Sequence, residues 1–419
     1  MKRMLLLLAF VLLAAPPLPA AESLTLAEAL ATARVNQPQL AGAREAVAGA
    51  EARTGQSLAA YYPHLDLTAD WSKGRTYLTP LQAIRETELY SSAVNLHQTL
   101  YDFGRTAGTV ATAREEATAA REGLAATGQE VDLRVKAAFY LLLAAEKQLA
   151  VLDETVRARR ELYRQAAGFY AEGLRPKLDE TRAEADLFSA ESDRIRAENN
   201  RSLARVELAT AMGLTDPIER PLTEPGGNDT PPAALAALKQ QALAARPELK
   251  QLLARHRAAQ GSVATARSGH LPILTATASS GYAARDFPPD GAIWSVGVNV
   301  TVPLFSGFST VERVREAVAA RRATEAQLHD LQLRISGEVE AAWLAVREAR
   351  ARLVSTGKER EAARESLQLA TGRYREGVGT IIEMTDAQAR ALAAETAVVQ
   401  AGYDCRIAEA RLDRAVGNE

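Results

Sequence analysis

The chain repeats its own pattern, and this duplication restricts its fold more than any other feature. The stretch YREGVGTIIEMTD, which begins at Tyr374, resembles YAEGLRPKLDETR, which begins at Tyr170, 204 positions earlier. NQPQL at Asn36 and ARPEL at Ala245 match at a spacing of 209 positions. The two copies therefore differ in length by five residues, and the difference lies between positions 63 and 100. A repeat of this size predicts two similar structural units.

Within each copy, the period of the apolar residues changes from that of a helix to that of a strand and back. The strand pattern is clearest in AIWSVGVNVTVPLF, from Ala292, where apolar and polar residues mostly alternate. Such alternation predicts strands with one apolar and one polar face. We predict strands at 64–73 and 88–101 in the first copy, and at 273–283 and 292–303 in the second.

Long helices are predicted on both sides of these strands. Residues 24–60 are alanine-rich and helical in pattern, and residues 105–169 contain no proline. A helix over 105–169 would reach roughly 100 Å, and its apolar residues follow the heptad spacing of a coiled coil. A second helix at 178–212 would complete a helical hairpin, and residues 376–416 repeat the design.

The first 21 residues are identified as a secretory signal peptide. Lys2 and Arg3 precede a short apolar run, and small residues follow it at a suitable cleavage point. The formal net charge is −2 over 419 residues, which gives no indication of nucleic-acid binding. Cys405 is the only cysteine, so the exported chain has no disulfide framework.

The duplication also predicts the division of the chain. Residues 1–21 are the signal peptide, 22–215 the first structural repeat, and 233–419 the second. Between the repeats, residues 216–232 are rich in proline and glycine and are expected to form an irregular linker.

Two architectures fit four strands with one apolar face each. A small soluble sheet packed against the helices and a membrane β-barrel are nearly equally compatible with the pattern alone, and a long heptad segment is also typical of a plain coiled coil. Four strands cannot close a barrel, and open edges in lipid would cost several kcal/mol per unpaired backbone group. A barrel therefore requires several copies of the chain.

The two-copy order of helix, strands, long helix and second helix, with LYDFGR and PLFSGF before the long helices, resembles the TolC-like outer membrane efflux protein family. The resemblance covers essentially the whole mature chain. It implies a mainly α fold with a small β part, in which long coiled-coil hairpins form a trimeric α-barrel continuous with a twelve-stranded outer-membrane β-barrel. It also implies a passive exit duct, without enzyme activity, cofactor or metal.

The same resemblance implies a location and partners. The homotrimer would sit in outer-membrane lipid with a long periplasmic extension. A periplasmic adaptor protein and an inner-membrane transporter would complete a tripartite efflux or secretion system, and nucleic acid plays no part.

The helix turns are expected at the periplasmic tip, where such channels are gated. By resemblance, the gate residues are Glu383, Asp386, Tyr374 and Asp179. Glu383 and Asp386 share a helix face, so a trimer would gather six carboxylates and attract cations. Thr380 also predicts a capping box with Glu383, which is the purely structural interpretation.

The turns themselves are expected to contact the adaptor, through Gly173 and Leu174 in the first copy and Gly377, Val378 and Gly379 in the second. Gly173 and Gly377 are equally suited to ending a helix in the left-handed conformation.

One position departs from the family pattern. Gly379 stands where an arginine that closes the gate is expected. The lock is then weaker here, or it is provided by Arg175 or Lys177 in the other turn.

Two rival functions differ in class. An enzyme is not favoured, because the five histidines have no metal-ligand spacing and no nucleophile motif accompanies them: His64, His97, His256, His270 and His329. A soluble periplasmic coiled-coil adaptor or scaffold would share the signal peptide and the helical hairpins. It would not need an apolar face on four strands.

Overall fold

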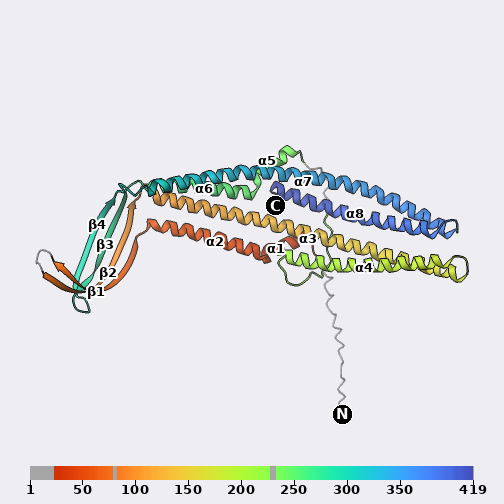
Figure 1. The fold of residues 1–419 in the computed structure, drawn as a ribbon, viewed down its shortest axis with the longest axis horizontal. Coiled ribbons are helices and arrows are strands. Elements are labelled where there is room, and N and C mark those ends of the chain that lie inside the picture. Colours follow the sequence, from red (N-terminus) through yellow and green to blue (C-terminus); the bar gives the residue numbers. More distant parts are fainter. Residues whose placement is uncertain (1–22, 79–82, 227–232, 419) are drawn as a thin grey trace, which may run out of the picture. The chain divides into compact units, whose positions relative to one another are not determined.

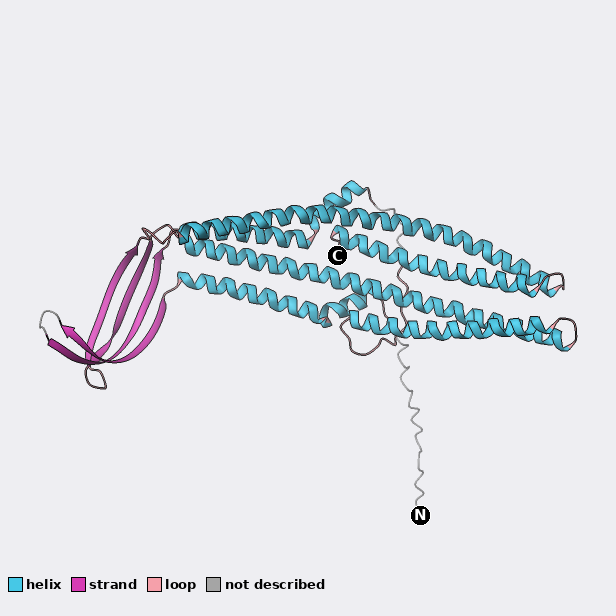
Figure 2. Ribbon diagram, viewed as in Figure 1, coloured by secondary structure: helices cyan, strands magenta, loops and turns pink. Residues whose placement is uncertain are grey.

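The computed structural model describes residues 23–78, 83–226 and 233–418 (Figures 1 and 2). The predicted signal peptide, 1–21, lies outside the described residues. The helices are α1 (Leu26–Asn36), α2 (Pro38–Leu58), α3 (Arg105–Ala171), α4 (Lys177–Ala211), α5 (Leu235–Ala245), α6 (Pro247–Ser268), α7 (Ser309–Arg375) and α8 (Ile381–Val416), with a short 3-10 helix at Ala59–Tyr61. The strands are β1 (His64–Leu78), β2 (Ala83–Tyr101), β3 (Ile273–Ala284) and β4 (Gly291–Thr301).

The same order of elements occurs twice. The two long helices, α3 and α7, have 67 residues each, and α7 begins 204 positions after α3. The segment 24–60, helical in pattern, forms two helices and not one, because α1 ends at Asn36 and α2 begins at Pro38. Proline lacks the backbone N–H of a helix interior and disfavours a helical residue before it, so the chain breaks there. Pro247 starts α6 in the same way.

The four strands form one antiparallel sheet in the order β1-β2-β3-β4. His64 lies opposite His97 in the first hairpin, and Ile273 lies opposite Thr301 in the second. His64 and Ile273 are equivalent positions at a spacing of 209, and His97 and Thr301 are equivalent positions at a spacing of 204. The five extra residues of the first copy therefore lie in the β1–β2 hairpin, beyond these pairs.

Strands β1 and β2 are longer than predicted, because pairing continues to Leu78 and Ala83. The alternation of apolar and polar residues stops after Trp71, which is why the sequence pattern ended the strands early. Charged residues continue the pairing instead. Arg75 Nη2 lies 3.6 Å from a carboxylate oxygen of Glu86 on the opposite strand, beyond the predicted ends.

The register of the sheet places apolar residues of all four strands on one face. We call this the apolar face, and its main members are Leu65, Leu67, Trp71, Tyr90, Val94, Leu96, Leu274, Trp294, Val296, Val298 and Val300. Trp294 and Val296 are 79% and 75% exposed, so no other part of the described chain covers them. The opposite, polar face includes Asp66, Thr68, Asp70, Asn95, His97, Thr277, Ser279, Asn299 and Thr301. Exposed valine and tryptophan in such number indicate a surface that meets lipid or another protein.

Strands β2 and β3 approach closely on the polar face. A Cβ atom on Gly281 would lie 2.0 Å from the carbonyl oxygen of Ser92, so even alanine cannot enter without moving the backbone. We expect Gly281→Ala to lower the amount of folded protein several-fold, as seen by quantitative blotting after limited proteolysis. Ser279→Ala, on the same strand and face, is the control and should leave that amount unchanged. Equal yields of the two variants would contradict this close approach.

The described chain divides into two units, and each takes residues from both copies. Among the described residues, unit 1 comprises 23–33, 135–226 and 359–403, and unit 2 comprises 34–78, 83–134, 233–358 and 404–418. Unit 2 contains the sheet and an apolar core built largely from helices α5 to α8, with Ile335 and Val339 fully buried. No helix in the described part of the chain is long and apolar enough to cross a membrane.

A buried arginine strengthens the core of unit 2. Arg246, between α5 and α6, is 3% exposed, and its guanidinium lies 2.5 Å from Glu338 on α7 and 3.3 Å from Glu248 on α6. A buried charge is tolerated only when it is paired in this way. The network therefore fixes the break between α5 and α6 against α7.

Candidate functional site

The first turn of unit 1 joins α3 to α4. Gly173 has φ +72°, and the backbone N–H of Leu174 donates to the carbonyl of Phe169 at 2.9 Å. These are the features of a glycine-terminated helix end. Pro176 occupies the N-cap position of α4, which begins at Lys177, and makes no side-chain capping hydrogen bond. The glycine thus ends the helix, as the sequence predicted.

The second turn, between α7 and α8, has the same construction. Gly377 has φ +77°, and the backbone N–H of Val378 donates to the carbonyl of Arg373 at 3.1 Å. Thr380 then caps α8, because its hydroxyl accepts from the backbone N–H of Glu383 at 3.2 Å.

Tyr374, one of the predicted gate residues, is completely buried beside the second turn. It packs in a cluster that unites all four helices of the two hairpins: Leu162, Ala166, Ala183, Tyr374, Ile381 and Met384. Its ring centroid lies 6.4 Å from that of Phe169 on α3. The Tyr374 hydroxyl has no hydrogen-bond partner among the described residues. Packing, rather than hydrogen bonding, holds this side chain.

Asp179, a second predicted gate residue, is buried near Tyr374 and is 7% exposed. Burial raises the pKa of the Tyr374 hydroxyl, the negative charge of Asp179 raises that pKa further, and Arg175 lowers it. Both effects that raise the pKa disfavour ionised tyrosine. The structure places Asp179 close enough for its charge to act on the Tyr374 hydroxyl. A role of these two residues in closing a gate stays a prediction.

Arg175 connects the two turns. Its Nη2 donates to the carbonyl oxygen of Gly379 at 3.3 Å, and its guanidinium carbon lies 5.2 Å from the centroid of the Tyr374 ring. Arg175 and Gly379 are 204 positions apart, so they occupy equivalent places in the two copies. A contact between equivalent positions joins the two hairpins directly.

Gly379, where the family resemblance led us to expect an arginine, has little room for a side chain. A Cβ atom on Gly379 would lie 3.0 Å from the carbonyl carbon and Cβ of Arg373 and from the nitrogen of Tyr374. A side chain there would crowd the end of α7. Arg175, in the first turn, instead places its guanidinium against this segment.

The two predicted gate acids lie on the first turns of α8 and are solvent-exposed. A carboxylate oxygen of Glu383 lies 3.6 Å from Nε of Arg373, and one of Asp386 lies 3.9 Å from Nη2 of Arg390. Their side chains are 49% and 63% exposed. Each acid therefore has one weak ion pair and remains accessible to ions.

Each turn also exposes apolar side chains. Leu174 is 64% exposed and Val378 is 71% exposed, and they are equivalent in the two copies. Leu178 and Ile382, a second equivalent pair, are 69% and 51% exposed. This second pair was not predicted, although the spacing of 204 positions could have identified it from the sequence.

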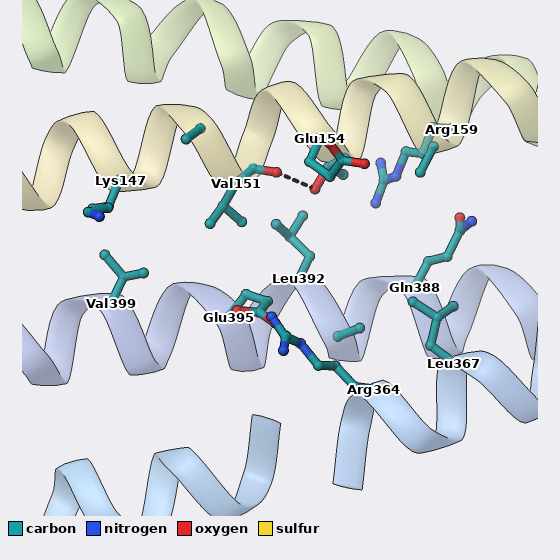
Figure 3. Close-up of a pocket in the computed structure, with 14 residues that line it drawn as sticks. Lys147, Val151, Glu154, Arg159, Arg364, Leu367, Gln388, Leu392, Glu395 and Val399 are labelled. Atoms are coloured by element: carbon teal, nitrogen blue, oxygen red, sulfur yellow. Dashed lines mark hydrogen bonds and ion pairs between the residues drawn. The ribbon is translucent and has the colours of Figure 1, made fainter. Parts of the chain in front are cut away.

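A cavity of about 500 Å³ separates parts of the two hairpins in unit 1 (Figure 3). Val151 on α3 and Leu392 on α8 line its centre, and Arg364 forms an ion pair with Glu395 at its side. Where such a cavity exists, the facing side chains lose van der Waals contact. Contacts at the turns, such as that of Arg175, therefore contribute more to holding the hairpins together.

The described residues contain no group of histidine, cysteine, aspartate or glutamate side chains that could hold a metal ion. Cys405 is buried, and burial raises the pKa of its thiol. Since nucleophilic cysteines are partly exposed and have a lowered pKa, Cys405 fits a structural role.

Comparison with known proteins identifies the family. The model of the family described as outer membrane efflux protein matches residues 29–214 and 238–418. The outer membrane efflux protein BepC of Brucella suis is 27% identical over 409 residues, which cover 95% of this chain and 86% of that protein. The outer membrane protein TolC of Vibrio cholerae is also 27% identical, over 94% of this chain and 90% of that protein.

The solved structure of VceC, an outer membrane protein of Vibrio cholerae, has the same fold. It superposes with a TM-score of 0.82 at 20% identity, over 94% of this chain and 96% of that one. These findings confirm the predicted fold class and the outer-membrane location. They also favour a channel over a soluble periplasmic adaptor or scaffold. Since the family model matches both copies of the repeat, the chain is a member of the outer membrane efflux protein family.

Proposed function

We propose that three copies of this chain form one outer-membrane exit channel that is gated at its periplasmic tip and performs no chemistry. The observation that carries the proposal is the exposed apolar face of a sheet with two edge strands, β1 and β4. In lipid, unpaired strand edges cost several kcal/mol per backbone group. Three sheets of four strands would close a twelve-stranded barrel without edges, and the helical hairpins would form the periplasmic duct.

Cell fractionation tests this proposal. We expect the protein in the outer membrane, migrating as a trimer on a denaturing gel without heating and as a monomer after heating. Recovery with the soluble periplasmic proteins would overturn the channel and support a scaffold. Recovery in the membrane as a heat-insensitive monomer would overturn the trimer.

The partners follow from the same proposal. A periplasmic adaptor would dock on the turns and an inner-membrane transporter would supply the energy. The exposed apolar residues Leu174 and Val378 support this docking site, since hydrophobic side chains exposed in matching positions are typical of an interaction surface. Glycines Gly173 and Gly377 would hold these residues at the apex of each turn.

The gate acids give a test at the tip. We expect Glu383→Ala with Asp386→Ala to lower the preference for cations over anions by about tenfold, because the variant removes six carboxylates that concentrate cations at the entrance. Block by divalent cations should weaken as well. Single-channel recordings with a salt gradient across a planar bilayer measure both effects.

A matched control for this variant lies on α7. Glu325→Ala with Asp330→Ala removes the same charge, in this case from ion pairs to Arg321 and Arg334 within α7. This control should retain most of the selectivity. If both double variants change selectivity equally, the net charge of the channel, and not the tip, determines it.

A further inference from the structure

Strands β1 and β4 are the edges of the sheet, and within the described chain neither pairs with a further strand on its outer side. This inference rests on the proposed trimer, in which β4 of one copy pairs with β1 of the next. Two such edge strands could pair in several registers. The internal repeat supplies the register, because the chain already contains an equivalent junction.

That junction is the pairing of β2 with β3, which joins the first copy of the repeat to the second. His97 lies opposite Thr277, and Asn95 lies opposite Ser279. Each repeat has a first and a second strand, β1 and β2 or β3 and β4. In a trimer, the junction of β4 with β1 of the next copy again joins the second strand of one repeat to the first strand of another. The two junctions are therefore quasi-equivalent, and backbone ladders repeat at fixed spacing whatever side chains they carry.

The equivalence of positions is fixed by the hairpin registers. Residues of β1 correspond to residues of β3 at a spacing of 209, and residues of β2 correspond to residues of β4 at a spacing of 204. His97 thus corresponds to Thr301, and Thr277 corresponds to Thr68. We propose that β4 pairs antiparallel with β1 of a second copy of this chain, with Thr301 opposite Thr68.

The faces of the two strands agree with this register. It places Val300 opposite Ala69 and Val298 opposite Trp71, all on the apolar face. A slip by one residue would place Val298 opposite Asp70 and put a carboxylate on the face that meets lipid. Such a slip reverses every side chain of a strand, and burying the charge would cost several kcal/mol.

If one strand slipped by two residues along the other, every side chain would stay on the same face of the sheet. A glycine favours the proposed register over such slips. In the β2–β3 junction, Ala93 lies opposite Gly281, and a Cβ atom on Gly281 would lie 2.8 Å from Cβ of Ala93. The equivalent pair in the proposed interface is Gly297 with Ser72. One member of each pair is again glycine. Inside the subunit nothing requires glycine at 297, because a Cβ atom there would make only an ordinary contact, 3.5 Å from Thr277.

Thiol cross-linking in outer membranes tests the register. In a Cys405→Ala background, Thr301→Cys is combined with Thr68→Cys and treated with a short bifunctional thiol reagent. We expect covalently linked oligomers on a heated denaturing gel, at a yield at least several-fold above that of either single-cysteine variant. The intrachain pair His97→Cys with Thr277→Cys is the matched control and should cross-link within one chain.

The slipped registers are tested with the same Thr301→Cys strand. Pairs with Asp66→Cys and Asp70→Cys correspond to slips of two residues in each direction and should cross-link less. A higher yield from either pair, or no cross-link from any pair while the unheated trimer persists, would overturn the register. Absence of the unheated trimer in the unmodified protein would instead overturn the trimer proposal itself.

Discussion

Arg175→Ala is expected to make the channel conduct at rest. The variant removes the hydrogen bond to the Gly379 carbonyl and the guanidinium that lies over Tyr374, and both connect the two hairpins. Together these contacts are worth about 1–2 kcal/mol in each subunit. If three subunits open together, their effects multiply, and the opening equilibrium shifts by about a hundredfold or more.

Single-channel recording in planar bilayers measures this effect as a larger resting conductance and a larger open fraction. Cells that depend on this channel should also become more sensitive to bulky antibiotics that the closed channel excludes. Both readouts respond to the gate without requiring the transported substrate.

Two variants separate the contact from the charge. Lys177→Ala removes one positive charge from the same turn, where its Nζ lies 6.0 Å from the Tyr170 ring, and should leave the resting conductance low. Arg175→Lys retains the charge but loses the planar guanidinium, and should give an intermediate conductance. Equal conductance of Arg175→Ala and Lys177→Ala would show that charge alone matters and would contradict the contact.

The sequence predicted the elements that depend on periodicity. The helix at 105–169 agrees with α3, because neither proline nor a change of period interrupts it. The hairpin ends of β1 and β2 were predicted too short, since the residues beyond the predicted ends, such as Arg75 and Glu86, pair through charge and carry no apolar signal. The break at Pro38 was also missed, because alanine-rich helical pattern continues on both sides of it.

At the tip, the family resemblance suggested gate residues but not their contacts. The departure at Gly379 was visible in the sequence, and Arg175 and Lys177 were both candidates for a lock in the other turn. The contact of Arg175 with the Gly379 carbonyl required the structure, because side-chain direction at a turn depends on the packing of four helices. Its role as a lock stays a prediction. The same packing buries Tyr374, and its neighbours Leu162 and Met384 lie more than 200 residues apart in the chain.

Tyr374→Ala is expected to have a still larger effect on the tip. Removing a fully buried aromatic side chain leaves a cavity and costs about 3–5 kcal/mol. The cluster shared by α3, α4, α7 and α8 would lose its largest member. We expect rapid protease cleavage at the turns and a high resting conductance, while the heat-sensitive trimer remains because the sheet is unchanged.

Tyr374→Phe distinguishes packing from hydrogen bonding. The hydroxyl has no partner among the described residues, so phenylalanine should keep the turns protected from protease at neutral pH. A Tyr374→Phe channel that is as open as Tyr374→Ala would contradict this, and would show that the hydroxyl closes the gate through a contact made in the assembled channel.

Alkaline pH tests the burial of the same residue. Burial and Asp179 raise the pKa of the Tyr374 hydroxyl above its ordinary value, about 10. The folded tip therefore favours neutral tyrosine, so this stabilisation is fully present below about pH 10 and is lost as the pH rises through the raised pKa. Protease sensitivity of the turns should increase above about pH 10 in the unmodified protein and less in Tyr374→Phe, which cannot ionise. Identical pH profiles would mean that groups other than the Tyr374 hydroxyl control the alkaline opening.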